Sequence, residues 1–124
     1  MKFDNINAIV SGGVSGLGFW TCERIVKAGG KVAMLDVNEK LGAEVAGKLG
    51  ARARFIKTDV SSEHEVTAAV AQAEGAFGSV QLVVNCAGVL GAGRTLGREG
   101  PMQTDFFAKV IHINLIGTFN LIKA

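Results

Sequence analysis

The chain has 124 residues, of which 48% are hydrophobic and 19% charged, and its formal net charge is +2. This composition indicates a globular protein with a sizeable core, and the length suits one domain over residues 1–124. The absence of a basic cluster argues against nucleic acid as a partner, and no apolar stretch is long enough to cross a membrane. Because the N-terminus lacks a signal-peptide pattern, we expect a cytoplasmic protein.

The first predicted element is a short apolar strand over Asn7–Val10, which leads into the glycine-rich stretch 11–18. A helical pattern follows from about Gly16. Strand, glycine-rich turn and helix in this order place backbone N–H groups at a helix N-terminus, where they can bind an anion. Lacking side chains, Gly12, Gly16 and Gly18 would allow a tight turn and the close approach of a diphosphate. The spacing alone is a weak signal, because a chain with 17 glycines produces it by chance.

The second strand, predicted over Lys31–Asp36, ends on an acid. A helix capped by Asn38 and closed by Gly50 follows. Asp36 lies 18 residues after Gly18, where a carboxylate can accept hydrogen bonds from both hydroxyls of an adenosine ribose. It would also repel a 2′-phosphate, which favours NAD over NADP. The alternative is an acid that only stabilises the start of the helix.

A third strand is predicted over Ala51–Lys57, and Asp59 and Val60 follow it. We expect these two residues beside the adenine of a dinucleotide, with a simple turn acid as an equal alternative. Ser62 and Glu65 match a capping box, in which each side chain bonds to the backbone N–H of the other. An amphipathic helix then runs to Phe77.

A fourth buried strand is predicted over Val80–Cys86, followed by Ala87 and Gly88. A glycine directly after an apolar strand indicates a bend where backbone meets a ligand. Cys86 fits a small packing residue better than a nucleophile, because no base is paired with it. Since Cys22, the other cysteine, forms no metal or redox motif with it, we expect two reduced, mostly buried thiols and no metal site.

A glycine-rich loop over Gly91–Pro101 precedes the last helix, which is predicted from about Thr104 to the end of the chain. Asn114 falls within the core-facing stripe of this helix, and a buried amide needs hydrogen-bond partners. It could bridge loops structurally or position a proton relay. His64 and His112 fit surface or packing positions better than catalytic ones.

Alternating strands and helices indicate βαβ units with right-handed crossovers. The predicted fold class is therefore α/β, a Rossmann-type doubly wound parallel sheet with helices on both faces and strand order 3-2-1-4. Ligands of such sheets bind beyond the carboxyl ends of the strands, where the winding reverses. Every motif described above follows the carboxyl end of a strand, apart from Asn114 in the last helix.

Together these motifs resemble the N-terminal half of the classical short-chain dehydrogenase/reductase family, and within it the type-2 3-hydroxyacyl-CoA dehydrogenases. The resemblance implies an NAD-dependent oxidoreductase that interconverts a secondary alcohol and a ketone of the hydroxyacyl-CoA or hydroxysteroid class. It also implies a homo-oligomer, specifically a tetramer with the last helix at an interface. The implied cofactor-binding residues are Gly12, Ser15, Gly16, Leu17, Gly18, Asp36, Asp59, Val60, Cys86, Ala87 and Gly88, and Asn114 is the implied catalytic residue, supporting the proton relay.

One departure from the family pattern concerns the catalytic residues. The family's catalytic Ser, Tyr and Lys follow the position of Asn114, and this chain contains no tyrosine. We therefore expect the first half of a longer enzyme or a truncated chain. The main alternative is a non-catalytic dinucleotide-binding module or truncated pseudoenzyme. A methyltransferase-type fold is less favoured, because the stretch 85–88 and Asn114 do not match it, and the lack of a Gly-Lys-Ser/Thr motif excludes a P-loop NTPase.

Overall fold

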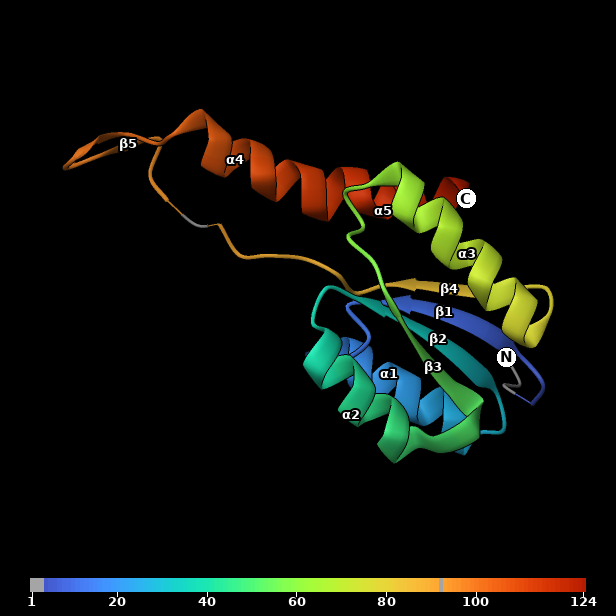
Figure 1. Ribbon diagram of the computed structural model, residues 1–124. Coiled ribbons are helices and arrows are strands. Elements are labelled where there is room, and N and C mark those ends of the chain that lie inside the picture. Colours follow the sequence, from blue (N-terminus) through green and yellow to red (C-terminus); the bar gives the residue numbers. More distant parts are fainter. Residues whose placement is uncertain (1–3, 92) are drawn as a thin grey trace.

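The computed structural model describes residues 4–91 and 93–124, and its centre is a four-stranded parallel sheet (Figure 1). The strand order is β3-β2-β1-β4, so the predicted order 3-2-1-4 is confirmed. The strands of this sheet are β1 (Asn7–Ser11), β2 (Lys31–Asp36), β3 (Ala53–Lys57) and β4 (Leu82–Asn85). The helices are α1 (Gly16–Lys27), α2 (Glu39–Leu49), α3 (Glu63–Phe77), α4 (Thr104–Ile111) and α5 (Gly117–Lys123).

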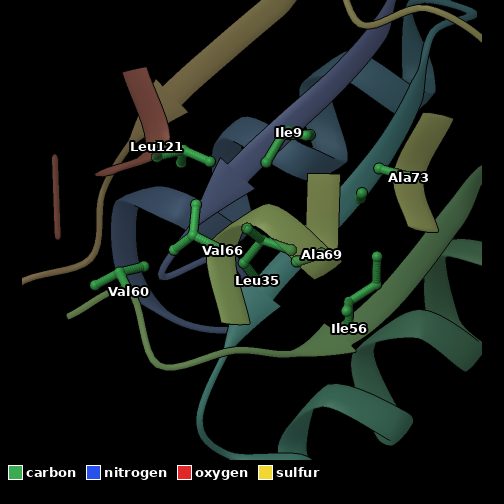
Figure 2. Close-up of a cluster of buried hydrophobic side chains, with 9 residues drawn as sticks. Ile9, Leu35, Ile56, Val60, Val66, Ala69, Ala73 and Leu121 are labelled. Carbon is green, nitrogen blue, oxygen red and sulfur yellow. The ribbon is translucent and has the colours of Figure 1, made fainter. Parts of the chain in front are cut away.

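Helices cover both faces of the sheet. Alternate side chains of each strand point to opposite faces, so the two inner strands feed two separate cores. On one face, Ile9 and Leu35 pack against α3 and Leu121 of α5 (Figure 2). On the other face, Val10 and Met34 pack with residues of α1 and α2. This burial on both faces explains why β1 and β2 are apolar throughout, as central parallel strands are.

The structure shortens two predicted strands and adds a hairpin. Residues Gly50–Arg52 form a short 3-10 helix (η1), so β3 begins at Ala53, and β4 begins at Leu82. The loop predicted over Gly91–Pro101, of which residue 92 lies outside the described residues, contains the two-residue strands β5 (Leu96–Gly97) and β6 (Gly100–Pro101). Strands this short carry no hydrophobic alternation, so no sequence pattern could reveal them.

The last helix is not a uniform α-helix, and this corrects the prediction for Asn114. A π-helical segment, η2 (His112–Ile116), separates α4 from α5. Asn114 lies within it and is exposed, not buried in a core-facing stripe. The extra residue of a π-turn rotates the side chains that follow it relative to those before it. The stripe drawn with uniform α-helical spacing was therefore wrong, and the buried amide of this helix is Asn120.

The described helices include none that is both long enough and apolar enough to traverse a bilayer.

Candidate functional site

A cavity of about 640 Å³ opens at the carboxyl end of the sheet. This volume is typical of small-molecule and cofactor sites. The cavity lies beyond β1 and β4, where the winding of the sheet reverses. All eleven predicted cofactor-binding residues line it: Gly12, Ser15, Gly16, Leu17, Gly18, Asp36, Asp59, Val60, Cys86, Ala87 and Gly88. The fold thus brings together residues that are up to 76 positions apart in the sequence.

The glycine-rich turn packs too tightly for any larger side chain at three positions, Gly12, Gly13 and Gly18. A Cβ on Gly18 would lie 2.0 Å from the carbonyl oxygen of Gly12. A Cβ on Gly12 would lie 2.8 Å from the backbone nitrogen of Ala87, and Gly12 also has a φ of +62°. The turn is therefore in direct backbone contact with both the first turn of α1 and the segment after β4.

The N-terminus of α1 borders the cavity and carries no competing acid. Ser15 is the N-cap residue, its side chain makes no capping hydrogen bond, and the first turn contains no acidic residue. The N–H groups at a helix N-terminus and the helix dipole favour an anion. Since Gly16 and Gly18 place no side chain in the way, this end of α1 fits a diphosphate group.

Ser11 holds the two central strand ends together, and the sequence reasoning did not include it among the site residues. Its side chain is 1% exposed, and its Oγ accepts hydrogen bonds from the backbone nitrogens of Cys86 and Ala87, both at 3.2 Å. A buried hydroxyl needs partners of this kind. A polar residue at the end of an otherwise apolar strand was the signal that could have identified it.

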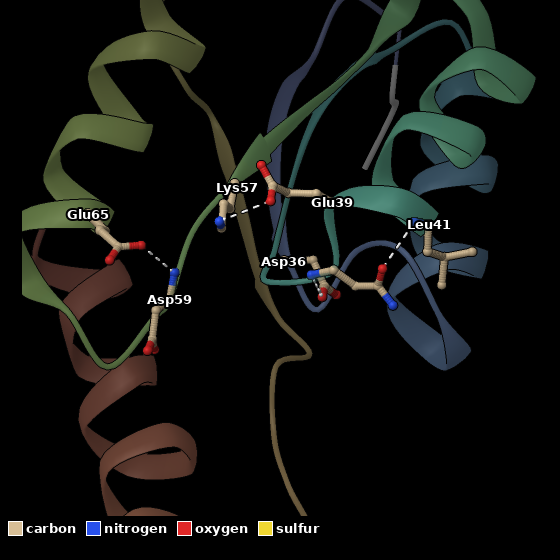
Figure 3. A network of polar contacts seen from close by, with 7 residues as sticks. Asp36, Glu39, Leu41, Lys57, Asp59 and Glu65 are labelled. Atoms are coloured by element: carbon tan, nitrogen blue, oxygen red, sulfur yellow. Dashed lines mark hydrogen bonds and ion pairs between the residues drawn. The ribbon is translucent and has the colours of Figure 1, made fainter.

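Among the residues that the structure describes, two carboxylates and one cation line the cavity. Oδ1 of Asp36 accepts from the backbone nitrogen of Asn38 at 3.1 Å (Figure 3). Oδ1 of Asp59 accepts from the backbone nitrogen and the hydroxyl of Ser61, at 2.9 and 2.6 Å. Since the hydrogen bonds described for both carboxylates go to Oδ1, Oδ2 of each can accept from a ligand. The cation is Lys109 of α4, which the sequence reasoning missed because only the tertiary fold brings α4 to the cavity.

The capping box predicted at the start of α3 is only half formed. The Ser62 hydroxyl accepts from the backbone nitrogen of Glu65, at 3.3 Å, as expected. The Glu65 carboxylate does not return to Ser62 and instead accepts from the backbone nitrogen of Asp59, at 2.8 Å (Figure 3). The backbone nitrogen of Ser62 donates to the Asp59 carbonyl at 3.0 Å. The start of α3 is therefore tied directly to the cavity wall.

Both cysteines are free thiols, one buried and one half-buried. Burial raises the pKa of Cys22 to about 12, and the neighbouring Cys86 adds to this shift. Burial also raises the pKa of Cys86. Because the thiolate is the nucleophilic form, a raised pKa makes Cys86 a poor nucleophile at neutral pH. This agrees with a packing role for Cys86 on the cavity wall.

Asn114 does not line the cavity but fastens a segment that does. Its Oδ1 accepts from the backbone nitrogen of Val89 at 2.8 Å, and its Nδ2 donates to the Val89 carbonyl at 3.0 Å. The side chain thus pairs with one residue of the loop after β4 as a neighbouring strand would. These bonds agree with both accounts that the sequence left open, a bridge between segments and the support of a proton relay. The histidines are both exposed, at the start of α3 and in η2.

This chain matches known proteins in both sequence and fold. The sequence profile described as short chain dehydrogenase matches residues 6–124. The 3-hydroxyacyl-CoA dehydrogenase type-2 of Drosophila melanogaster is 41% identical over 121 residues, which are 96% of this chain and 48% of that protein. The protein of the same name from Homo sapiens is 42% identical over 118 residues, 94% of this chain and 45% of that protein. The chain therefore spans about half the length of the curated relatives it matches.

A solved structure shows the same architecture. The 3-ketoacyl-(acyl-carrier-protein) reductase from Brucella melitensis, complexed with NADH, superposes with a TM-score of 0.87 at 28% sequence identity. The superposition covers 98% of this chain and 49% of that one.

Proposed function

The chain belongs to the short-chain dehydrogenase family, and we propose that it forms the dinucleotide-binding part of an NAD-dependent oxidoreductase. The proposal is carried by one observation: all eleven predicted cofactor-binding residues line one cavity. A bound dinucleotide would supply a nicotinamide ring that accepts or donates a hydride. The tasks of this chain are to bind that cofactor, orient it and exclude water around it.

The residues present fit the diphosphate and the adenosine half of a dinucleotide. The uncapped N-terminus of α1 would take the diphosphate, and the bare backbone of the glycine turn would allow its close approach. Asp36 would accept from the adenosine ribose hydroxyls, and Asp59 and Val60 would border the adenine. A carboxylate at the ribose position repels a 2′-phosphate, so we propose NAD rather than NADP as the cofactor.

For the reaction, we propose oxidation of a secondary alcohol to a ketone, or its reverse, on a hydroxyacyl-CoA or hydroxysteroid substrate. The named activity of the relatives at 41% and 42% identity supports this class. The chain contains no tyrosine, so we assign the family's proton-transferring residues to sequence outside these 124 residues. Asn114 would support that proton relay by fixing the loop at Val89.

We further propose that the protein assembles as a homo-oligomer through its last helices, as a tetramer by family resemblance. Large apolar side chains on η2 and α5 are exposed, with Leu115 at 60%, Phe119 at 58% and Ile122 at 69%. An apolar stripe of this kind marks an interaction surface in a water-soluble protein.

A second candidate is a dinucleotide-binding module without catalysis, which the absence of tyrosine favours. Intact mass of the protein expressed from its own gene, followed by calorimetry with NAD and NADP, separates the two. A mass well above 12.9 kDa, preferential NAD binding and NADH formation with a 3-hydroxyacyl-CoA would support the oxidoreductase. NAD binding at 12.9 kDa without turnover supports the module, and a protein that binds neither dinucleotide refutes both.

A further inference from the structure

We propose that Asn120 of α5 is a positioning residue for the adenine end of the dinucleotide site. The inference rests on the proposed function, because it assumes that Asp59 and Val60 border a bound adenine. Asn120 does not line the cavity itself. It acts through Val60, and so determines where the wall formed by Asp59 and Val60 lies.

The side chain of Asn120 is hydrogen-bonded to this wall. Asn120 is 5% exposed, and its Nδ2 donates to the carbonyl oxygen of Val60 at 3.0 Å, across 60 residues of sequence. A buried amide is costly to desolvate, and an apolar residue would fill the same place at lower cost. Holding the backbone of Val60 accounts for a polar residue at this position.

Two more residues of α5 contact the same segment, one turn to either side. A Cβ on Gly117 would lie 2.6 Å from Cγ2 and 3.0 Å from Cβ of Val60, so α5 approaches the wall closely at this point. Lys123 pairs with Glu63 at the start of α3. Positions 117, 120 and 123 share one face of α5, and that face contacts Val60 and Glu63.

The helix that carries these contacts is itself held by the core. Leu121 is 2% exposed and belongs to the same buried cluster as Val60 and Ile9 (Figure 2). From the other direction, the Glu65 carboxylate holds the backbone nitrogen of Asp59. The wall is therefore fixed from both sides, by α3 at Asp59 and by α5 at Val60.

The test uses the protein expressed from its own gene and two probes, NAD and nicotinamide hypoxanthine dinucleotide. Hypoxanthine carries a carbonyl oxygen where adenine carries an amino group, so a carboxylate near that edge discriminates between the two. Asn120→Leu should weaken the binding of NAD by about tenfold and the binding of the hypoxanthine analogue by less than about threefold. In a dehydrogenase assay, KM for NAD should rise while kcat stays near its original value.

Gly117→Ala is the second variant, because it acts on Val60 without removing a hydrogen bond. Alanine favours a helix over glycine, yet its Cβ would displace Val60. It should lower the preference for NAD over the analogue. The matched control is Asn7→Leu, since Nδ2 of Asn7 donates to the carbonyls of Phe77 and Ser79 at the opposite end of the sheet.

The outcomes separate the inference from the function beneath it. A reduced preference for NAD in Asn120→Leu or Gly117→Ala, but not in Asn7→Leu, supports the positioning role. Equal losses for both dinucleotides, or unchanged affinities in the two α5 variants beside a wild type that binds NAD, refute the inference alone. A wild-type protein that binds neither dinucleotide refutes the proposed function and this inference together.

Discussion

Replacing Gly18 by alanine tests the backbone contact on which the cavity depends. The new Cβ would lie 2.0 Å from the Gly12 carbonyl oxygen, whereas Cβ contacts below 3.0 Å essentially never occur in proteins. The start of α1 or the glycine turn must therefore move by about 1 Å. The clashing atom belongs to the backbone and cannot rotate away, so the cost falls in the upper range of overpacking. We expect the free energy of unfolding to drop by about 3 kcal/mol.

The matched control is Gly47→Ala, which makes the same exchange within α2. A Cβ on Gly47 meets nothing within 4 Å, so only the helix preference for alanine acts, and stability should rise by about 0.5–1 kcal/mol. Urea unfolding of both variants gives the two free energies, and calorimetry gives NAD affinity. The same displacement should weaken NAD binding by Gly18→Ala at least tenfold. Gly47→Ala should leave NAD binding unchanged. Equal stabilities of the two variants, or unchanged NAD binding in Gly18→Ala, would refute the close packing described for α1.

Three further predictions concern charge, loop geometry and pH. Asp36→Ala should weaken NAD binding by about 10–100-fold, which is the contribution expected of hydrogen bonds to a carboxylate, and should reduce the preference for NAD over NADP. An unchanged preference in calorimetry would show that Asp36 does not bind the ribose. In the protein expressed from its own gene, Asn114→Ala should lower kcat more than NAD affinity, because both hydrogen bonds to the backbone of Val89 are lost. A wild-type kcat would contradict this. The Cys22 thiol has a pKa of about 12 when folded, against an ordinary value of 9.0, so the unfolded chain ionises first as pH rises. The free energy of unfolding should therefore fall as the pH rises from about 9 to 12, by up to about 1.4 kcal/mol per pH unit. Urea unfolding across this range should show a shallower decline for Cys22→Ala, and identical slopes would contradict the assignment.

Much of the site was predictable because its parts are local in sequence. The turn at Gly12–Gly18 follows a strand and opens a helix, and Asp36 ends a strand. These features can be read without knowing what packs against them. Once the strand order is fixed, the carboxyl ends of parallel strands meet at one edge, and this brings the predicted cofactor-binding residues together.

The errors lie where distant contacts decide the local structure. Uniform helical spacing placed Asn114 in the core, but the π-turn at η2 leaves it exposed and pairs it with Val89. Glu65 fits a capping box locally, yet the tertiary structure turns it toward Asp59. In both cases a polar side chain had several partners available, and the sequence could not rank them.

The strands, the glycine turn and the acid at position 36 can be read from the amino-acid sequence, because hydrophobic periodicity and glycine spacing act over a few residues. The contacts of Ser11, Lys109 and Asn120 depend on the tertiary structure. Each meets the site across 60 or more residues of chain or through a helix with no local motif. A buried polar group takes the partner that the completed packing offers, and that partner cannot be identified before the chain has folded.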